Sequence, residues 1–314
     1  MNSAETFWNL TKSKTYKILL NVLLRVPDVF YSALFAVAFP VYKALHTKRA
    51  YGRTVKHLKN AKAYLKISTT ARDVFKGIFW NALDSYRGLA RFKSVESRIV
   101  YENEEIIRDA IVECAKNGKP IAGISIHQGA FELLHRALCR YSEHVHLITD
   151  SVGDEAFREV LKDLRSAPHL TEYHPEETGK LLRDLFHTKG ILAMVFDQGK
   201  NTKGNSVELF GQKSTLYLRL PQKVNEMGAG IVLFRTWTEY APQKRIVIRF
   251  EKYYPPQFDK THVDHKLQKD EHSALVSNIA KEIESWISEH PDQWSWNYHG
   301  NFKVSRPSNE SRIR

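Results

Sequence analysis

The chain has 314 residues, with 47 Lys plus Arg against 35 Asp plus Glu and a formal net charge of +12. Residues 1–100 carry 18 basic and 5 acidic residues, whereas the rest of the chain carries 29 basic and 30 acidic residues. This distribution argues against a uniformly basic nucleic-acid-binding protein and favours a basic N-terminal region that meets an anionic surface. The 42% hydrophobic and 26% charged residues exclude a disordered chain, and two cysteines exclude a disulfide framework.

The first predicted element is an apolar segment near the N-terminus. Ile18–Leu24 is apolar apart from Asn21, and Val29–Tyr42 is a run of 14 residues without a charge. A membrane-spanning helix needs about 20 predominantly apolar residues, and shorter runs more often lie in a membrane interface or a protein core. We expect this segment to associate with a membrane. Residues 18–45 could span the bilayer or lie in its interface.

A basic segment follows from Lys43 to Lys66, with eight Lys or Arg and no acidic residue. Apolar residues recur there at helical spacing from Tyr51 to Leu65. The basic residues on the other faces are Arg49, Arg53, Lys56 and Lys59. An apolar stripe beside a basic face is typical of a helix on an anionic membrane surface, so we predict that these four residues contact the membrane. The alternative is a solvated basic helix that packs on the protein.

From about residue 96 onward, predicted strands and helices alternate. Helical periodicity and end signals predict helices over residues 104–116, 131–141, 155–165, 178–188, 216–227 and 273–289. Apolar or alternating runs predict strands over residues 121–126, 145–149, 191–196, 230–236 and 245–252. Apolar strands separated by helices are typical of a mostly parallel sheet that is covered on both faces.

The predicted fold class is therefore α/β. A mostly parallel central sheet has helices on both faces and is preceded by an N-terminal hydrophobic and basic amphipathic helical region. We expect a membrane-associating helical region over residues 1–95, an α/β domain over residues 96–304 and a mobile tail over residues 305–314.

The end of the strand at residues 121–126 carries the first candidate site. His127 follows the strand, Gly129 permits a sharp turn, and Glu132 falls in the first turn of the next helix. A carboxylate there can fold back to hydrogen-bond the imidazole, which would orient a general base. The alternative is a structural histidine at a strand end.

Further polar residues follow other predicted elements. Asp197 and Gln198 emerge from the strand at residues 191–196, where they suit the positioning of a polar substrate or form a capped turn. Arg235 ends the strand that starts at Gly230, and it could contact substrate or pair with Glu239. Arg165 lies at the end of the helix predicted over residues 155–165, where it could bind an anionic substrate or be a solvated cation.

Other chemistries find little support in the motifs. The sequence contains no Gly-rich phosphate loop, no dinucleotide-binding fingerprint and no Gly-x-Ser-x-Gly nucleophile turn. The spacings of the 14 histidines match no zinc pattern. We therefore expect neither a metal nor a cofactor.

Taken together, these motifs resemble the bacterial lipid A biosynthesis late acyltransferases, within the wider lysophospholipid acyltransferase group. The resemblance covers roughly residues 15–303 and rests on five segments in order. These are His127-x4-Glu132, Asp197-Gln198, Leu209-Phe210-Gly211 with the following helix, Gly228-Ala229 through Arg235, and Pro291-Asp292-Gln293-Trp294-Ser295-Trp296 with Phe302-Lys303.

The resemblance implies transfer of a fatty acyl chain from acyl carrier protein, or from acyl-CoA, to a hydroxyl of a lipid A precursor or related glycolipid. It implies a location at the cytoplasmic face of a bacterial inner membrane. His127 would be the general base and Glu132 would orient it. Arg165 would stabilise the oxyanion, and no covalent enzyme intermediate is needed.

This chain departs from the family pattern in two segments. Gln128-Gly129-Ala130-Phe131 stands where the family commonly has Phe-Gly-Asn-Trp, and Tyr298-His299-Gly300-Asn301 stands where it often has His-Arg-Arg. Fewer arginines beside a phosphorylated lipid would weaken charge-assisted contacts. A phospholipid, aminolipid or mannolipid acceptor is therefore the alternative. A non-catalytic polyanion-binding protein that uses Lys43–Lys66 is the rival from another class.

Overall fold

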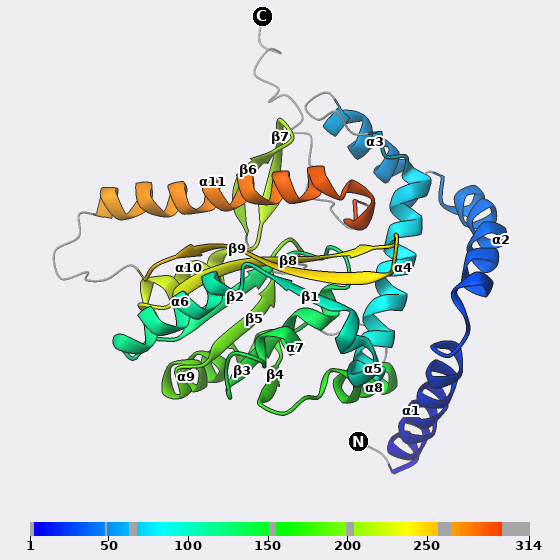
Figure 1. The fold of residues 1–314 in the computed structure, drawn as a ribbon, viewed down its shortest axis with the longest axis horizontal. Helices are drawn as coiled ribbons and strands as arrows, with labels where there is room; N and C mark the ends of the chain where they lie inside the picture. The colour runs from blue at the N-terminus through cyan, green and yellow to red at the C-terminus, as the bar shows by residue number, and fades with distance from the viewer. Residues whose placement is uncertain are drawn as a thin grey trace, which may run out of the picture.

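The computed structural model describes residues 3–47, 49–62, 68–150, 155–198, 204–256 and 265–296. The segment expected as a mobile tail, residues 305–314, lies outside the described residues. Four helices precede the sheet along the chain: α1 (Ser3–Leu23), α2 (Asp28–His46), α3 (Ala50–Lys62) and α4 (Ala71–Ala90). Figure 1 shows α1 and α2 along one side of the molecule, with α4 between α2 and the sheet.

The centre of the molecule is a seven-stranded sheet with the order β1-β9-β8-β2-β5-β3-β4. Strands β8, β2, β5, β3 and β4 are parallel to one another, whereas β9 runs antiparallel to β8 and carries β1 parallel to itself. The strand bounds are β1 (Ile99–Glu102), β2 (Ile121–Ser125), β3 (Val145–Ile148), β4 (Leu170–Tyr173), β5 (Ile191–Val195), β8 (Gly230–Glu239) and β9 (Arg245–Tyr254). The structure thus confirms the α/β class and the mostly parallel sheet.

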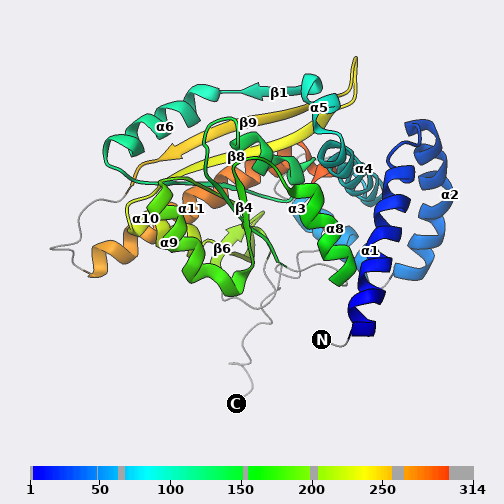
Figure 2. The same ribbon diagram turned by 90° about the horizontal axis from the view of Figure 1, so that it is seen from below.

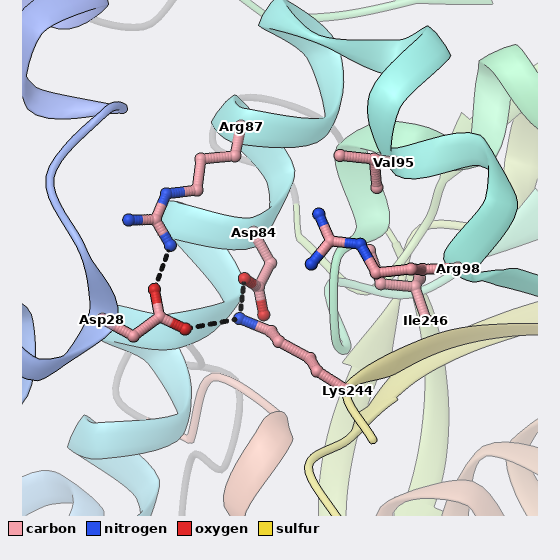
Figure 3. A pocket seen from close by; sticks show the side chains of 7 residues that line it. All are labelled: Asp28, Asp84, Arg87, Val95, Arg98, Lys244 and Ile246. Atoms are coloured by element: carbon pink, nitrogen blue, oxygen red, sulfur yellow. Dashed lines mark hydrogen bonds and ion pairs between the residues drawn. The ribbon is translucent and has the colours of Figure 1, made fainter.

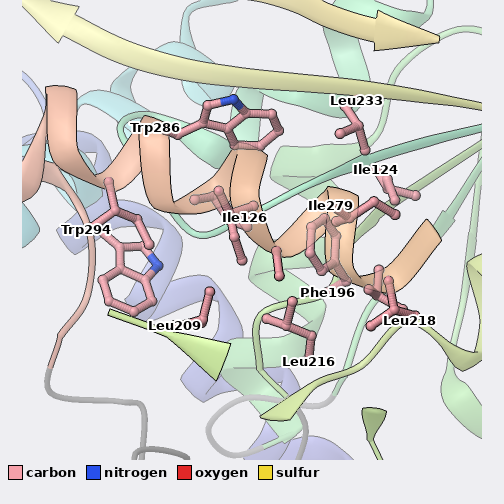
Figure 4. Packing of buried hydrophobic residues seen from close by; sticks show 14 of the residues in the cluster. Ile124, Ile126, Phe196, Leu209, Leu216, Leu218, Leu233, Ile279, Trp286 and Trp294 are labelled. Atoms are coloured by element: carbon pink, nitrogen blue, oxygen red, sulfur yellow. The ribbon is translucent and has the colours of Figure 1, made fainter. Parts of the chain in front are cut away.

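Helices cover both faces of this sheet (Figures 1 and 2). One core lies beneath α11 (His265–Glu289), where Trp286 and Ile279 pack over Ile124, Phe196 and Leu233 (Figure 4). The other core lies beneath α6 (Glu104–Lys116) and α7 (Leu134–Leu138). Every residue of β2 is buried because its side chains alternate between these two cores, which explains the apolar run from Ile121 to Ile124.

The remaining elements are short or connect the strands. They are α5 (Phe92–Val95), α8 (Glu155–Arg165), α9 (Thr178–Thr188), α10 (Arg219–Glu226) and the 3-10 turns η1 (Glu96–Arg98), η2 (Phe131–Leu133), η3 (Pro175–Glu177) and η4 (Pro291–Gln293). A separate hairpin joins β6 (Asn205–Leu209) to β7 (Gln212–Leu216).

Several predicted bounds were wrong. The helix expected over residues 216–227 begins at Arg219, because residue 216 ends strand β7 of the hairpin. The helix expected over residues 131–141 is a 3-10 turn followed by five α-helical residues. The last helix begins at His265, before the predicted residue 273. The helices α6, α8 and α9 have the predicted bounds.

Parts of the N-terminal region pack into the two cores of the sheet. Leu58 and Val74 belong to the core beneath α11, and Leu89 and Val95 belong to the opposite core. Part of the apolar face predicted for the basic segment therefore packs against the protein in α3, where Leu58 and Ala61 are buried, whereas Val55 is 43% exposed. Arg49, Arg53, Lys56 and Lys59 are exposed, so they remain available to an anionic surface.

Candidate active site

The carboxyl ends of β2 and β5 lie side by side at the centre of the sheet. Their last residues, Ser125 and Val195, are paired in parallel register. His127 follows β2 by two residues, and Asp197 follows β5 by two residues. Because parallel strands end at the same edge of a sheet, the fold brings together two side chains that are 70 residues apart in sequence.

His127 and Asp197 form a hydrogen-bonded dyad. The Nδ1 atom of His127 lies 2.6 Å from Oδ1 of Asp197. The backbone N–H of His127 donates to both carboxylate oxygens at 3.2 Å, and the indole Nε1–H of Trp294 donates to Oδ2 at 3.0 Å. Asp197 is only 1% exposed, so these donors hold a carboxylate that water barely reaches.

This geometry determines the tautomer of the imidazole. A carboxylate oxygen accepts hydrogen bonds, so the proton of neutral His127 belongs on Nδ1 and the lone pair on Nε2. Nε2 has no hydrogen-bond partner among the described residues, and the side chain is 20% exposed. The ring packs edge-on against Phe131 at 4.6 Å between centroids. His127 thus has the orientation and the access that a general base needs.

The carboxylate of Glu132 binds Arg165 and not the imidazole. Arg165 donates from Nε to Oε2 at 2.8 Å and from Nη2 to Oε1 at 2.7 Å, and its Nη1 donates to Glu172 at 3.2 Å. Burial, the largest single influence, would raise the pKa of Glu132, but the charge and hydrogen bonds of Arg165, with smaller contributions from His135 and His127, together lower it. The expected hydrogen bond from His127 to Glu132 is therefore replaced by the bond to Asp197.

Two neighbours of Glu132 hold the end of α8, where Arg165 lies. His135 Nε2 lies 3.3 Å from the carbonyl oxygen of Arg165. Arg136 donates from Nη2 to the carbonyl oxygens of Leu164 and Ser166 at 2.8 and 2.9 Å. Burial lowers the pKa of His135 to about 4, so its imidazole is neutral at neutral pH. Residues 135 and 136 are three and four positions after Glu132, so all three side chains reach the end of α8.

The C-terminal segment anchors the turn that carries His127. The side-chain Nε2 of Gln128 donates to the carbonyl of Trp286 at 2.9 Å, and the backbone N–H of Gly129 donates to the carbonyl of Gln293 at 3.1 Å. Gly129 has a φ of 57°, and a Cβ there would lie 2.4 Å from the carbonyl oxygen of Thr236. Only glycine fits this turn, which the sequence indicated correctly.

Sequence reasoning missed the contribution of Trp294 to the site. The residue is 2% exposed and its indole lies edge-on to Trp296, at 4.9 Å between centroids. The available signal was the Pro291-Asp292-Gln293-Trp294-Ser295-Trp296 run, which we used for the family resemblance but not for the site. Nothing local in that run indicates that its first tryptophan reaches the end of β5.

Arg235 lies in a buried cluster of its own. It donates from Nε to Glu251 at 2.5 Å and from Nη2 to Glu289 at 2.6 Å. It is 1% exposed, so its charge is committed to these carboxylates and not to Glu239, which pairs with Arg245. Gln198 is half-buried and directly follows Asp197 in the turn after β5.

No group of three or more His, Cys, Asp or Glu side chains in the described part of the chain could hold a metal ion. The arrangement at the strand ends is an imidazole oriented by Asp197, beside the Glu132–Arg165 ion pair.

Comparison with protein-family models gives a match. A family model described as bacterial lipid A biosynthesis acyltransferase matches residues 86–303, which include the dyad, the Glu132–Arg165 pair and Trp294. Comparison with curated protein sequences gives no match.

Proposed function

The chain belongs to the bacterial lipid A biosynthesis acyltransferase family and is an acyltransferase; from that premise we propose that it transfers a fatty acyl chain to a hydroxyl of a lipid A precursor or a related membrane glycolipid. The donor in this proposal is acyl carrier protein or acyl-CoA. The observation that carries it is the His127–Asp197 dyad, whose Nδ1–Oδ1 distance of 2.6 Å leaves Nε2 of a partly exposed ring for substrate.

In the proposed mechanism, Nε2 of His127 removes the proton of the acceptor hydroxyl. The hydroxyl oxygen attacks the thioester carbonyl and forms a tetrahedral oxyanion. Collapse of this intermediate breaks the C–S bond, and the departing thiolate takes the proton back from the imidazolium. The products are the new ester and the free thiol, and no covalent bond to the protein forms.

Asp197 has the orienting role in this proposal. Its carboxylate accepts the Nδ1–H of neutral His127 and stabilises the imidazolium that forms during attack. Glu132 acts from a greater distance. Its ionised carboxylate also interacts electrostatically with His127, although its hydrogen bonds go to Arg165.

Arg165 is assigned to holding Glu132, because three of its nitrogens already bind carboxylates. Gln198 is the remaining polar candidate for a substrate contact at this strand end. Arg235 supports α11 through Glu289, and its burial removes it from the proposed substrate contacts.

The membrane side of the proposal rests on the N-terminal region. Helix α2 is long and apolar enough to cross a membrane by length and composition, and only 11% of that window is buried. Basic residues follow it on α3. We place the protein on the cytoplasmic face of a bacterial inner membrane, where anionic lipid and an acidic acyl carrier would both meet its basic surface.

Turnover by purified protein, with acyl carrier thioester and lipid acceptor, tests the chemistry. His127→Ala should lower kcat by about 10³-fold or more, because the base is lost. His144→Ala is the matched control. His144 is exposed and directly precedes the amino end of β3, whereas His127 follows the carboxyl end of β2. Full activity of His127→Ala would refute the mechanism.

A second test identifies the acceptor. Mass spectrometry of lipid extracts from cells with and without the gene should show an acylated lipid A precursor that disappears with the gene. A change confined to a phospholipid, aminolipid or mannolipid would redirect the acceptor and leave acyl transfer standing. Salt-sensitive polyanion binding without turnover would support the non-catalytic alternative.

A further inference from the structure

The outer faces of α1 and α2 expose an unusual set of apolar side chains. Ten of the fourteen exposed large hydrophobic residues in the described part of the chain lie on these two helices. We call them the apolar stripe: Ile18, Leu19, Val22, Leu23, Val29, Phe30, Leu34, Val37, Val41 and Leu45. On α2 they recur every three or four residues from Phe30 onward, so they occupy one side of the helix.

The opposite side of α2 packs on α4. Tyr31 and Phe35 contact Phe79, with ring centroids 5.9 and 5.7 Å apart. Further along, Phe39 and Tyr42 contact Phe75, at 6.2 and 5.1 Å. These contacts make the two helices antiparallel over about three turns. Both views of the ribbon show them side by side (Figures 1 and 2).

Helix α4 could not accompany α2 through the hydrocarbon core of a membrane. It carries five charged residues, Arg72, Asp73, Lys76, Asp84 and Arg87. Charged side chains are rare in membrane-spanning segments because hydrocarbon solvates them poorly. Its other side packs on the active-site region, since a Cβ at Gly88 would lie 2.7 Å from Leu133.

Ion pairs fix the turn between α1 and α2 to the rest of the protein (Figure 3). Arg87 binds the Asp28 carboxylate, and its Nε donates to the carbonyl of Leu24 at 3.2 Å. Lys244, in the turn between β8 and β9, pairs with Asp84 and lies 3.6 Å from Asp28. Further along α1, Lys17 pairs with Asp163 of α8. Both helices are thus attached to the rest of the protein.

We propose that α1 and α2 lie in the plane of an anionic membrane surface, with the apolar stripe inserted among the lipids of one leaflet and neither helix crossing it. Charge complementarity selects this partner. Asp28 is the only acidic residue between positions 12 and 62, and it is paired with Arg87. The exposed cations of this region, which include Lys14, Arg25, Lys43 and Arg53, suit anionic headgroups. The inference rests on the proposed membrane attachment and not on the acyl-transfer chemistry.

Cysteine labelling of the full chain in its native membrane tests the orientation. Arg25→Cys and Thr47→Cys place thiols on either side of α2. A membrane-impermeant maleimide should label both in inverted inner-membrane vesicles and neither in intact spheroplasts. Labelling of the two positions from opposite sides would show a spanning helix and overturn the proposal. The unsubstituted chain is the blank, because burial makes both native thiols less reactive. It raises the pKa of the Cys114 thiol, and it raises the pKa of the Cys139 thiol to about 11.

Flotation with phosphatidylglycerol–phosphatidylethanolamine vesicles tests the stripe itself. Val37→Asp combined with Val41→Asp should lower vesicle binding by about tenfold or more, because it puts two charges into the inserted face. Val112→Asp is the matched control, since Val112 is also an exposed valine on a helix, α6, and this variant should bind as the unsubstituted chain does.

Unchanged vesicle binding by the double variant would overturn the lipid assignment. The assignment would also fail if the unsubstituted chain is a dimer without vesicles and the double variant is a monomer. Turnover in mixed micelles tests the acyl-transfer chemistry without vesicles. A variant that turns over in micelles but gives an unexpected vesicle result would therefore overturn this inference and leave the proposed function intact.

Discussion

The Nδ1 atom of His127 lies 2.6 Å from the Oδ1 oxygen of Asp197, a carboxylate that a different strand contributes. The pairing joins the ends of the two central strands of the sheet, β2 and β5. It replaces the local His127–Glu132 contact that the sequence spacing suggested, and it leaves Glu132 to hold Arg165.

Asp197→Asn should lower kcat strongly and leave the fold intact. An amide has no charge to stabilise the imidazolium, and it can offer its NH₂ to Nδ1, which favours the wrong tautomer. We expect a loss of about 10²- to 10⁴-fold in kcat. Asp109→Asn, on the exposed side of α6, should change nothing. Equal activity of the two variants would exclude an orienting role for Asp197.

Trp294→Phe should reduce kcat with little change in KM. The substitution removes the Nε1–H that donates to Asp197 Oδ2 at 3.0 Å but keeps most of the buried ring. We expect a loss of about tenfold, the size of one hydrogen bond to a charged group. Trp296→Phe is the control, because its Nε1–H donates to the carbonyl of Pro291. If both variants lose kcat equally, packing alone explains Trp294.

The stability of the protein should decrease as the pH falls, because folding disfavours protonation of His135. Its pKa is about 4 in the folded state against about 6.5 in the unfolded chain, so the unfolded state takes up the proton first as pH falls. The contribution is complete above pH 6.5 and is lost toward pH 4. It amounts to roughly 3 kcal/mol of unfolding free energy across that window.

His135→Gln keeps an N–H that can donate to Arg165 but removes the titration. Denaturant unfolding at pH 7 and pH 4.5 should show a smaller pH difference for this variant than for the unsubstituted chain. His144→Gln, which alters an exposed histidine, should keep the full difference. An unchanged pH difference in His135→Gln would contradict the assignment.

Gly129→Ala should destabilise the protein and reduce turnover together. Its φ of 57° and the 2.4 Å approach to the Thr236 carbonyl leave no room for a methyl group. We expect a loss of about 1–3 kcal/mol in unfolding free energy. Gly179→Ala is the contrasting control, because a Cβ there meets nothing within 4 Å in a helix, and it should be neutral or slightly stabilising. Thermal unfolding measures both, and equal effects would count against the strained turn.

The sequence by itself determined the elements whose signals are local. Apolar runs identified β2 and β5, because a strand buried on both faces needs apolar side chains throughout. Helical periodicity, and the Asn117-Gly118 pair that typically ends a helix, correctly predicted the bounds of α6. His127, Asp197 and Gly129 were found as strand-end residues for the same reason. The signal failed for β6 and β7, whose half-exposed residues have no apolar run.

Tertiary structure alone decided which of these residues meet. Strand order places Asp197 beside His127, and the path of the chain after α11 brings Trp294 to the same carboxylate. Tertiary packing also buries Leu58 and Ala61 of α3 against the protein, whereas it leaves the apolar stripe of α1 and α2 exposed. Periodicity along a helix reports only that one face is apolar. Whether protein or solvent lies against that face depends on contacts between segments far apart in the chain.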